Sequence, residues 1–452
     1  MKKILLLAAL VFSIGGVWAQ CFETIDTGYQ YTSGLSADGN LIVAGHNGYG
    51  QLGDGTTISR SQFKQIFPAT GWKSIGPGGV HMLAIREDNT LWAWGYNANG
   101  QLGDGTIASK NAPLQITANA DWAMASGGAS HSMAIKTDGT LWGWGNNYSS
   151  QLGNGISGSQ FLPLQVGTAN DWVMVKAGVL HSMALKSNGT MWAAGSGGYG
   201  QLGLGGWANM ATFTQVGTDT DWASFTTGVE HTLAIKTNGT LWAFGRNDSG
   251  QLGDGSNTVR YAPVQIGTDT NWVQVSAGEH HTYGLKADGT LWAWGKNDNR
   301  QLGDNTYINR NTPGQVGTDM NWTQVSAGGY YGVALKEDGT FWGWGSNNYG
   351  QLGVSNTPTG TPVMATCPTL GNKTFEAIAL RVFPNPAREV LNIAFSNGST
   401  VDGVSITDMA GKIILTNGEA NSTVNIGQLQ NGIYFIKVIS GGRQHIQKFI
   451  KE

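Results

Sequence analysis

The sequence predicts an all-β chain in which a seven-bladed β-propeller is followed by a small β-sandwich. Three observations support this prediction. The tripeptide Gln-Leu-Gly recurs seven times at a constant spacing, from Gln51 to Gln351. Each repeat contains four short segments with the composition of strands. Glycine supplies 69 of the 452 residues and only 12% of the residues are charged, about half the usual share.

The sixth repeat illustrates the expected elements. Its four predicted strands cover residues 272–277, 281–286, 290–294 and the region around Gln315. Asp288-Gly289 is a hairpin turn signal between the second and third strands. Four strands in each of seven repeats are typical of a β-propeller. A β-solenoid is the alternative, and it would have shorter turns of regular length.

Sixteen of the 18 tryptophans occupy fixed repeat positions. Six begin the first strand of a repeat, six lie in the third strand at Trp92 and its equivalents, and four follow two residues later at Trp94 and its equivalents. Residues two apart on a strand share a face. We therefore expect these rings to pack between blades rather than to form a ligand platform.

The first residues are typical of a secretory signal. Lys2 and Lys3 precede an apolar run over 4–17, and a cleavage position lies before Gln20, so we predict a signal peptide over 1–19. A membrane anchor is the alternative, although the run is short for a membrane span. The mature chain is expected to be exported and to contain no integral membrane span.

The two cysteines, Cys21 and Cys367, lie at the ends of the repeat region, which we bound at 20–367. In the repeat frame they correspond to Asn321 and Gly317. They therefore flank the one connection between repeats that the ring lacks. An even pair of cysteines in an exported protein favours a disulfide, and two unpaired thiols are the alternative.

The repeat pattern G..H..AL...G.LW.WG.N..GQLGDG resembles that of the regulator of chromosome condensation family over residues 22 to about 366. The resemblance implies a seven-bladed propeller. The family's nucleotide exchange on a small nuclear GTPase is not expected here, because the chain is exported and its repeats carry no insertions. A bacterial relative that inhibits β-lactamases implies a protein-binding face.

Histidine recurs at His81 and every fifty residues to His281. Because the family pattern contains this histidine, we expect a structural hydrogen-bonding role rather than a metal site. His46 and His280 lie outside the pattern and are expected to be exposed.

Connections alternate between the two ends of a blade, so the loops after the first and third strands lie at one end. The repeats differ mainly there, and this favours a recognition surface over free drift of the loops. The predicted binding residues are Tyr49, Tyr96, Tyr148, Tyr199, Trp207, Arg246, His280, Lys296, Arg300 and Tyr349. Trp207 is the strongest candidate for a binding residue, since the other repeats have no tryptophan at the equivalent position.

No catalytic motif, phosphate-binding loop or zinc-type cysteine pair is present, so no catalytic residue, metal or cofactor is predicted. Asp54, Asp104 and Asp254 are interpreted as turn residues rather than calcium ligands. The net charge of −3 argues against a nucleic-acid partner. We expect a monomer.

After a linker over 368–377 the repeat disappears, and short alternating strands predict a β-sandwich over 378–452. This segment resembles the C-terminal sorting domain of the type IX (Por) secretion system. The residues that carry the resemblance include Pro384, Asn385, Pro386, Gly411, Lys412, Gly432 and Tyr434. It implies the type IX secretion machinery as a partner and passage through the periplasm to the cell surface or the medium.

Together these features predict an exported, non-enzymatic recognition protein that binds an unknown protein or glycan ligand through the variable loops. The alternatives are a secreted enzyme acting on polysaccharide and a passive spacer in a surface layer.

The cysteine pair gives a first test. A Cys21–Cys367 disulfide would stabilise the propeller by at most about 5–6 kcal/mol in the chain-entropy treatment. Peptide mass spectrometry under non-reducing conditions should detect the linked peptides. Free thiols at both positions would contradict the prediction.

Overall fold

The structure is a computed structural model that describes residues 22–66, 71–366, 380–395, 400–408, 413–417, 422–440 and 443–452. The chain divides into two compact units, Met1–Pro368 and Thr369–Glu452. The predicted signal peptide, both cysteines and the linker lie outside the described residues, as do Gly411 and Lys412. These predictions therefore remain untested.

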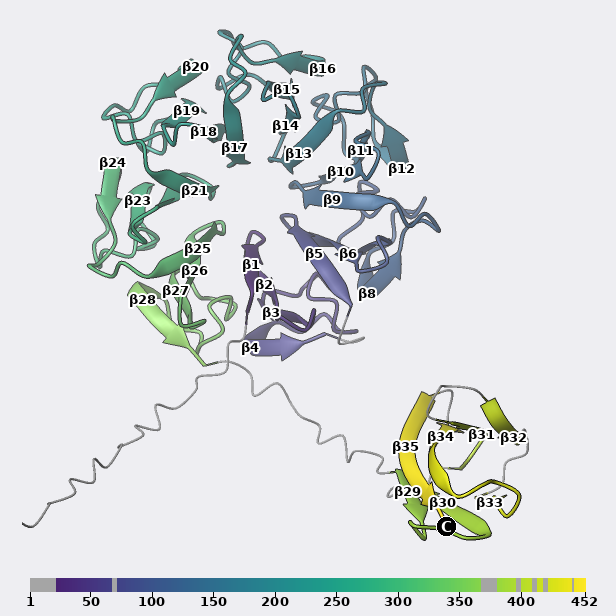
Figure 1. Cartoon of the computed structure of the whole chain (residues 1–452). Helices are drawn as coiled ribbons and strands as arrows, with labels where there is room; N and C mark the ends of the chain where they lie inside the picture. Colours follow the sequence, from purple (N-terminus) through teal and green to yellow (C-terminus); the bar gives the residue numbers. More distant parts are fainter. Residues whose placement is uncertain are drawn as a thin grey trace, which may run out of the picture. The chain divides into compact units, whose positions relative to one another are not determined.

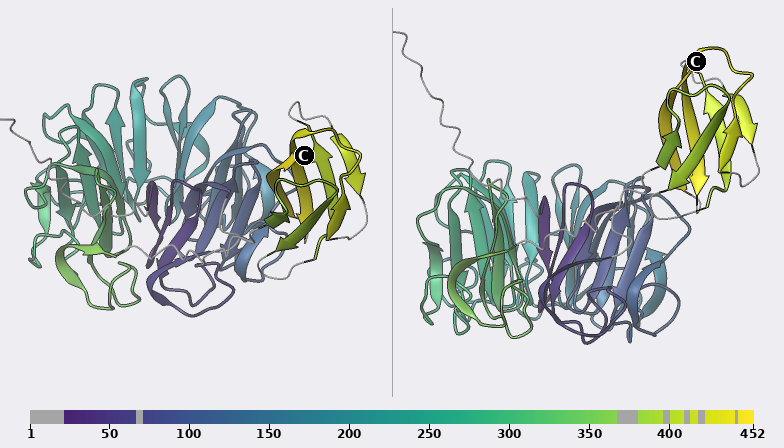
Figure 2. Two further views of the ribbon diagram at one scale, coloured as in Figure 1. Left: turned by 60° about the horizontal axis from the view of Figure 1, so that its bottom comes forward. Right: turned by 90° about the horizontal axis from the view of Figure 1, so that it is seen from below.

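The first unit is a ring of seven four-stranded antiparallel sheets, which are the blades of a β-propeller (Figure 1). The order of strands across each sheet follows their order along the chain. The first strand of each blade lies nearest the centre and the fourth lies at the rim (Figure 1). Figure 2 shows the same ring from two further directions, with loops at both ends of the blades. The predicted propeller is confirmed.

Blades 1 to 4 each consist of four consecutive strands. Blade 1 contains β1 (Thr24–Thr27), β2 (Tyr31–Leu35), β3 (Leu41–Gly45) and β4 (Arg60–Gln65). Blade 2 contains β5 (Trp72–Pro77), β6 (His81–Arg86), β7 (Leu91–Gly95) and β8 (Lys110–Gln115). Blade 3 contains β9 (Trp122–Gly127), β10 (His131–Lys136), β11 (Leu141–Gly145) and β12 (Gln160–Gln165). Blade 4 contains β13 (Trp172–Ala177), β14 (His181–Lys186), β15 (Met191–Gly195) and β16 (Met210–Gln215).

The remaining three blades repeat the arrangement. Blade 5 contains β17 (Trp222–Thr227), β18 (His231–Lys236), β19 (Leu241–Gly245) and β20 (Arg260–Gln265). Blade 6 contains β21 (Trp272–Ala277), β22 (His281–Lys286), β23 (Leu291–Gly295) and β24 (Arg310–Gln315). Blade 7 contains β25 (Trp322–Ala327), β26 (Tyr331–Lys336), β27 (Phe341–Gly345) and β28 (Thr359–Ala365).

The hydrophobic core lies between neighbouring blades. At the first interface, Leu41 and Leu52 of blade 1 pack against Trp72 and Trp94 of blade 2, and all four side chains are buried. The Trp72 ring also meets Trp92 edge-on, with ring centroids 6.0 Å apart. Equivalent clusters recur around the ring. The prediction that the repeated tryptophans pack the blades together is confirmed.

The Gln-Leu-Gly loop of each blade is held by the next blade. The backbone carbonyl of Gln101, on blade 2, accepts hydrogen bonds from two side chains of blade 3. Trp144 Nε1 donates at 2.9 Å and Ser132 Oγ at 2.7 Å. Both donors are buried, where a carbonyl without a partner would be costly. The glutamine carbonyl is therefore a fixed point of contact between blades.

The other two residues of the tripeptide have packing roles of their own. Leu102 is buried, and its backbone N–H donates to Asn97 Oδ1 at 2.9 Å. Gly103 has φ +78°, and a Cβ there would lie 2.8 Å from Trp144 Nε1. Glycine is required because the left-handed backbone and the indole both exclude a side chain.

The repeated histidines join blades from the inside. His81 Nε2 lies 2.9 Å from Ser132 Oγ. Because this hydroxyl donates to the Gln101 carbonyl, it accepts the N–H of the imidazole, and Nδ1 is left without a proton. The same contact joins His131 to Ser182, His181 to Thr232 and His231 to Thr282. These four contacts confirm the predicted structural role, whereas at the fifth histidine, His281, the corresponding residue is Gly332 and the contact is absent.

At the interface of blades 6 and 7, the hydroxyl that bonds to the glutamine carbonyl comes from a different residue. Gly332 stands where most other blades carry serine or threonine, so it has no hydroxyl to offer the Gln301 carbonyl. The hydroxyl of Tyr283, from blade 6, donates to this carbonyl instead and receives Trp344 Nε1 at 3.1 Å. A Cβ on Gly332 would lie 2.5 Å from the Tyr283 hydroxyl oxygen. The tyrosine therefore occupies the space that the glycine leaves.

Two blades lack the buried third-strand aromatic, because Ala44 and Ala194 replace it. Phenylalanines of the fourth strand, Phe63 and Phe213, fill the same space. A Cβ on Gly153 would lie 2.5 Å from the Phe213 ring, just as the equivalent glycine of other blades meets a tryptophan. Aromatic volume at the interface is thus retained by a residue from a different strand.

The ring closes between blades 7 and 1 by side-chain packing, and no described strand is exchanged between these blades. Phe22 and Phe63 of blade 1 meet Phe341 of blade 7, with centroids 5.3 and 4.8 Å apart. Thr32 Oγ1 donates to the Gln351 carbonyl at 2.7 Å, which repeats the contact of the other interfaces.

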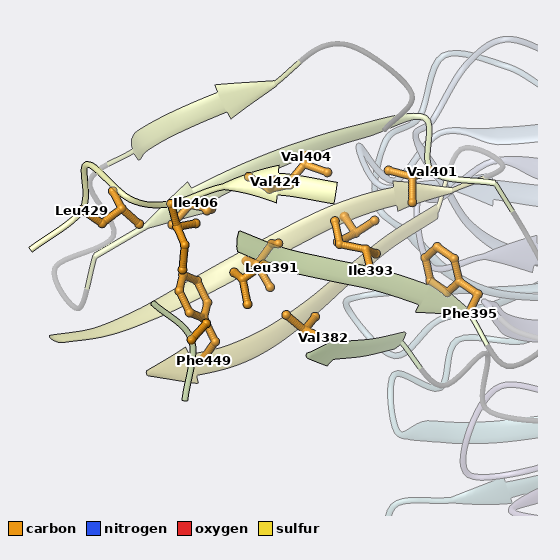
Figure 3. Packing of buried hydrophobic residues seen from close by; sticks show 14 residues of the cluster. Val382, Leu391, Ile393, Phe395, Val401, Val404, Ile406, Val424, Leu429 and Phe449 are labelled. Carbon is orange, nitrogen blue, oxygen red and sulfur yellow. The ribbon is translucent and has the colours of Figure 1, made fainter. Parts of the chain in front are cut away.

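The second unit is a small β-sandwich, as predicted. One sheet contains β29 (Leu380–Phe383), β30 (Val390–Phe395) and β33 (Thr423–Asn425). The other contains β31 (Gly403–Thr407), β32 (Ile413–Asn417), β34 (Gly432–Ser440) and β35 (Arg443–Lys451). Leu391, Ile406 and Phe449 lie in its apolar core (Figure 3). Asn385 accepts the Ile450 N–H at 2.9 Å, so this motif residue holds the last strand.

The buried histidines should make stability depend on pH. Burial lowers the pKa of His81, His131 and His281 to about 3, whereas an unfolded histidine titrates near 6.5. The unfolded chain therefore takes up protons first, and each histidine should lower the free energy of unfolding by up to about 1.4 kcal/mol per pH unit below about pH 6.5. Urea unfolding at several pH values measures this slope. The His81→Gln variant lacks one titrating group and should show a smaller slope. If the free energy of unfolding does not change with pH in either protein, the buried histidines do not have lowered pKa values.

The aromatic replacement in blade 4 can be tested by exchange. Phe213→Ala should lower the free energy of unfolding by about 2 kcal/mol, because the ring is partly buried and leaves a cavity. Phe213→Pro combined with Ala194→Trp restores the arrangement of the other blades and should recover most of this loss. Urea unfolding compares the three proteins. A single variant as stable as the parent would show that Phe213 does not fill the interface.

Candidate functional site

The loops after the first and third strands meet at one end of each blade, as strand parity predicts. The N–H of His46, after β3, donates to the Gln30 carbonyl, after β1, at 2.9 Å. Tyr96 and Val80 in blade 2 are joined in the same way at 3.0 Å. We call this end, formed by the loops after the first and third strands of all blades, the loop face.

Four aromatic side chains form a continuous arc on the loop face, from blade 7 across blade 1 to blade 2. Neighbouring rings of the arc are in contact. Their centroids are 4.6 Å apart for Tyr349 and His46, 6.0 Å for His46 and Tyr49, and 4.8 Å for Tyr49 and Tyr96. Tyr49 is 45% exposed and Tyr349 is 37% exposed. Partial burial lowers the pKa of His46, which favours the neutral imidazole. We call these four residues the aromatic arc.

The structure thus brings together three of the predicted binding tyrosines and adds His46, which the prediction left out. His46 was expected to be exposed, but it is only partly so because Tyr349 and Tyr49 pack on either side of its ring. Sequence position alone could not reveal that residues of blades 7, 1 and 2 meet.

A charged network lies on the other side of the loop face. Arg246 donates to Glu230 at 2.7 Å and to Asp248 at 2.6 Å, and its guanidinium lies 5.1 Å from the centroid of the Tyr199 ring. The two carboxylates raise the pKa of Arg246. The prediction named Arg246 and Tyr199, and the structure places them in contact with each other.

A third cluster lies on the loop face beside the cavity at the centre of the ring, which Tyr29 and Glu279 help to line. The Tyr29 hydroxyl donates to Glu279 at 2.6 Å and lies 3.3 Å from the Tyr330 hydroxyl. Lys296 Nζ lies 5.8 Å from the Tyr330 ring centroid. Burial and the Glu279 carboxylate raise the pKa of Tyr29. Tyr29, Tyr330 and Glu279 were absent from the predicted binding residues, although each varies between repeats.

His280 also belongs to this cluster, and here the prediction of an exposed side chain is wrong. Only 15% of the His280 side chain is exposed, and its Nε2 lies 3.6 Å from Glu279 Oε1. The ring lies between the loops of blades 5 and 6, where Arg246, Asp248 and Lys296 are further charged neighbours. Burial lowers the pKa of His280.

The remaining predicted residues lie apart. Tyr148 and Trp207 are each 76% exposed, and neither contacts another ring in the described part of the chain. Arg300 lies over Tyr307, 4.4 Å from its ring centroid. Trp207 therefore does not join the aromatic arc.

The acidic residues of the Gly-Asp-Gly turns are structural, as interpreted. Asp54 Oδ1 accepts hydrogen bonds from Thr56 and Asn47, and its other oxygen pairs with Arg60. Burial alone would raise the pKa of Asp54, but these contacts lower it and close the long loop between β3 and β4. No group of three or more His, Cys, Asp and Glu side chains that could hold a metal occurs among the described residues.

Comparisons with solved structures agree with the fold. Prp20p from Saccharomyces cerevisiae is 21% identical, with a TM-score of 0.65 over 78% of this chain and 90% of that chain. Yeast RCC1 (Prp20) bound to Kap60 is 20% identical, with a TM-score of 0.64 over 85% and 94%. Human WBSCR16 is 21% identical, with a TM-score of 0.62 over 69% and 85%. At these identities the likeness shows the fold alone.

Family comparisons assign both units. Residues 41–380 match the RCC1-like domain, and residues 381–452 match the secretion system C-terminal sorting domain. No curated protein matches the chain. The sorting domain indicates export by the type IX system to the cell surface or the medium. Nothing in the described part of the chain is a helix that could span a membrane. The chain therefore belongs to the RCC1-like domain family and carries a C-terminal sorting domain for secretion.

Proposed function

We propose that this chain is an exported, non-enzymatic recognition protein that binds a protein or a glycan through the loop face of its propeller. The observation that carries the proposal is the aromatic arc, in which Tyr349, His46, Tyr49 and Tyr96 meet across three blades. Exposed aromatic clusters of this kind are the usual anchors of binding sites.

The chemistry of the arc suits either ligand class. Tyrosine rings offer apolar faces for side chains or sugar rings, and their hydroxyls donate and accept hydrogen bonds. Asn99, Ser346 and Asn348 lie in the same loops. Tyrosine, serine, glycine and asparagine are also the residues that antibody loops use for protein recognition.

Rigidity of the loops supports binding. The Tyr49 N–H donates to Gln51 Oε1 at 3.0 Å, and the Gly50 N–H donates to the Asn47 carbonyl at 2.9 Å. Gln51 and Asn47 are themselves buried. A loop that is already ordered loses little conformational entropy on binding, so more of the contact energy appears as affinity.

The charged network would contribute specificity rather than general attraction. Arg246 is held by Glu230 and Asp248, so its charge is largely compensated. A ligand that approaches this side must match the fixed positions of the three groups. Mismatched charges are penalised at an interface more strongly than matched ones are rewarded.

A triple variant tests the proposal. The full exported chain, immobilised, would be exposed to proteins and glycans from its habitat. We expect a ligand that the parent retains to bind the Tyr49→Ala, Tyr96→Ala and Tyr349→Ala triple variant at least about thirtyfold more weakly, since one aromatic hot spot contributes ~2 kcal/mol. Surface plasmon resonance on the captured ligand measures the change.

Met320→Ala is the matched control, because Met320 is 62% exposed and lies in the connector between blades at the opposite end. It should bind like the parent. Equal binding by the triple variant would contradict recognition by the arc. Release of shorter sugars from a captured polysaccharide would instead support an enzyme.

A further inference from the structure

The first strands of the seven blades surround the centre of the ring (Figure 1), and residues of these strands line a central channel. Its cavity volume is about 420 Å³, which is in the range of small-molecule sites. One repeat position lines the cavity in all seven blades, and it holds Gly76 in blade 2 and a polar or charged residue in the other six. The charged residues that line the cavity are Asp26, Lys176 and Glu279.

Hydroxyl groups at this repeat position normally join neighbouring blades. Ser126 Oγ accepts the Ala177 N–H at 3.2 Å, and Ser276 Oγ accepts the Ala327 N–H at 3.0 Å. Thr226 makes the same contact at 3.3 Å. The hydroxyl therefore has a structural role, since it ties the inner strand of one blade to the next.

Lys176, in blade 4, breaks this rule. An ammonium group has no lone pair, so it cannot accept the equivalent hydrogen bond from Thr227. Lys176 lines the cavity and forms no ion pair with any described residue. The replacement removes a contact between blades and places an unpaired cation in a recess, so it has no evident structural benefit.

Asp26 occupies the same repeat position in blade 1. In a ring of seven, blade 4 lies opposite the junction of blades 7 and 1, so Lys176 and Asp26 stand on facing walls. The Asp26 carboxylate accepts the Thr27 N–H at 2.8 Å and the Ser326 hydroxyl at 3.1 Å. No ion pair joins it to Lys176 or to any other described residue.

We propose that the channel binds a small zwitterion, with its carboxylate beside Lys176 and its ammonium group beside Asp26. Gln274 and Gln324 also line the cavity, where their amide oxygens accept the backbone N–H groups of Val325 and Ile25, and Glu279 places further negative charge at the mouth. Charges act more strongly in a recess with limited water than in bulk solvent. This site is separate from the aromatic arc and does not depend on the proposed function.

Omega-amino acids are suitable probes, because in glycine, 4-aminobutyrate, 6-aminohexanoate and 8-aminooctanoate the separation of the two charges increases with the number of methylene groups, whose apolar contribution hexanoate and hexylammonium control. Isothermal titration calorimetry on the full chain should find one member that binds at least about tenfold tighter than hexanoate or hexylammonium. Lys176→Ser and Asp26→Asn should each weaken it by about tenfold or more.

Two controls make the result decisive. Lys73→Ser removes a lysine outside the channel, and the triple tyrosine variant alters only the loop face, so both should bind the probe like the parent. Without ligand, Lys176→Ser should melt at the same temperature as the parent or higher, because serine restores the contact between blades.

Several results would overturn the proposal. If no zwitterion binds, or if binding is unchanged in Lys176→Ser, the proposed site is wrong. If hexanoate binds as tightly as the best zwitterion, Asp26 has no role in binding. A Lys176→Ser protein that melts below the parent would show that the lysine is structural.

Discussion

The backbone carbonyl of the glutamine in each Gln-Leu-Gly loop is the contact on which the rest of the propeller depends. It belongs to one blade, and in every case the next blade supplies a hydrogen-bond donor to it. In each of the seven blades at least one buried donor reaches it, either an indole, as at Gln51, or a hydroxyl, as at Gln151. Because the loop that contains this carbonyl also carries the variable residues, the same contact fixes both the ring and the loop face.

Redundancy at this contact explains how the repeats tolerate change. Where Met82 offers no hydroxyl, Trp94 alone supplies the donor, and where Ala194 offers no indole, Ser182 does. At Gln301, Tyr283 of the same blade supplies the hydroxyl that Gly332 of the next blade lacks, and Trp344 of the next blade also donates. A buried carbonyl needs only one good partner, so either donor can be lost but not both. The result is a frame of nearly constant geometry that carries different residues on each blade.

Much of the fold was predictable because its physical causes are local and repeated. The inter-blade packing of Trp72 followed from the repeat spacing, and the structural role of His81 followed from the family pattern. The site was less predictable, because it depends on which blades face one another. Tyr349 and its partners meet only when the ring closes, and the burial of His280 results from the loops of two blades. A binding role for Lys176 could be inferred only from its position in the closed ring, on the wall that faces Asp26 of blade 1.

We infer that the variable loops are held as rigidly as the strands. Hydrogen–deuterium exchange of the free protein measures this rigidity through six loop amides that donate to buried asparagines, those of Leu52, Leu102, Leu152, Leu252, Leu302 and Leu352. We expect these amides to be protected nearly as well as those of the second strands, and far better than those of the connector containing Met320. Exchange of these loop amides as fast as that connector would contradict it.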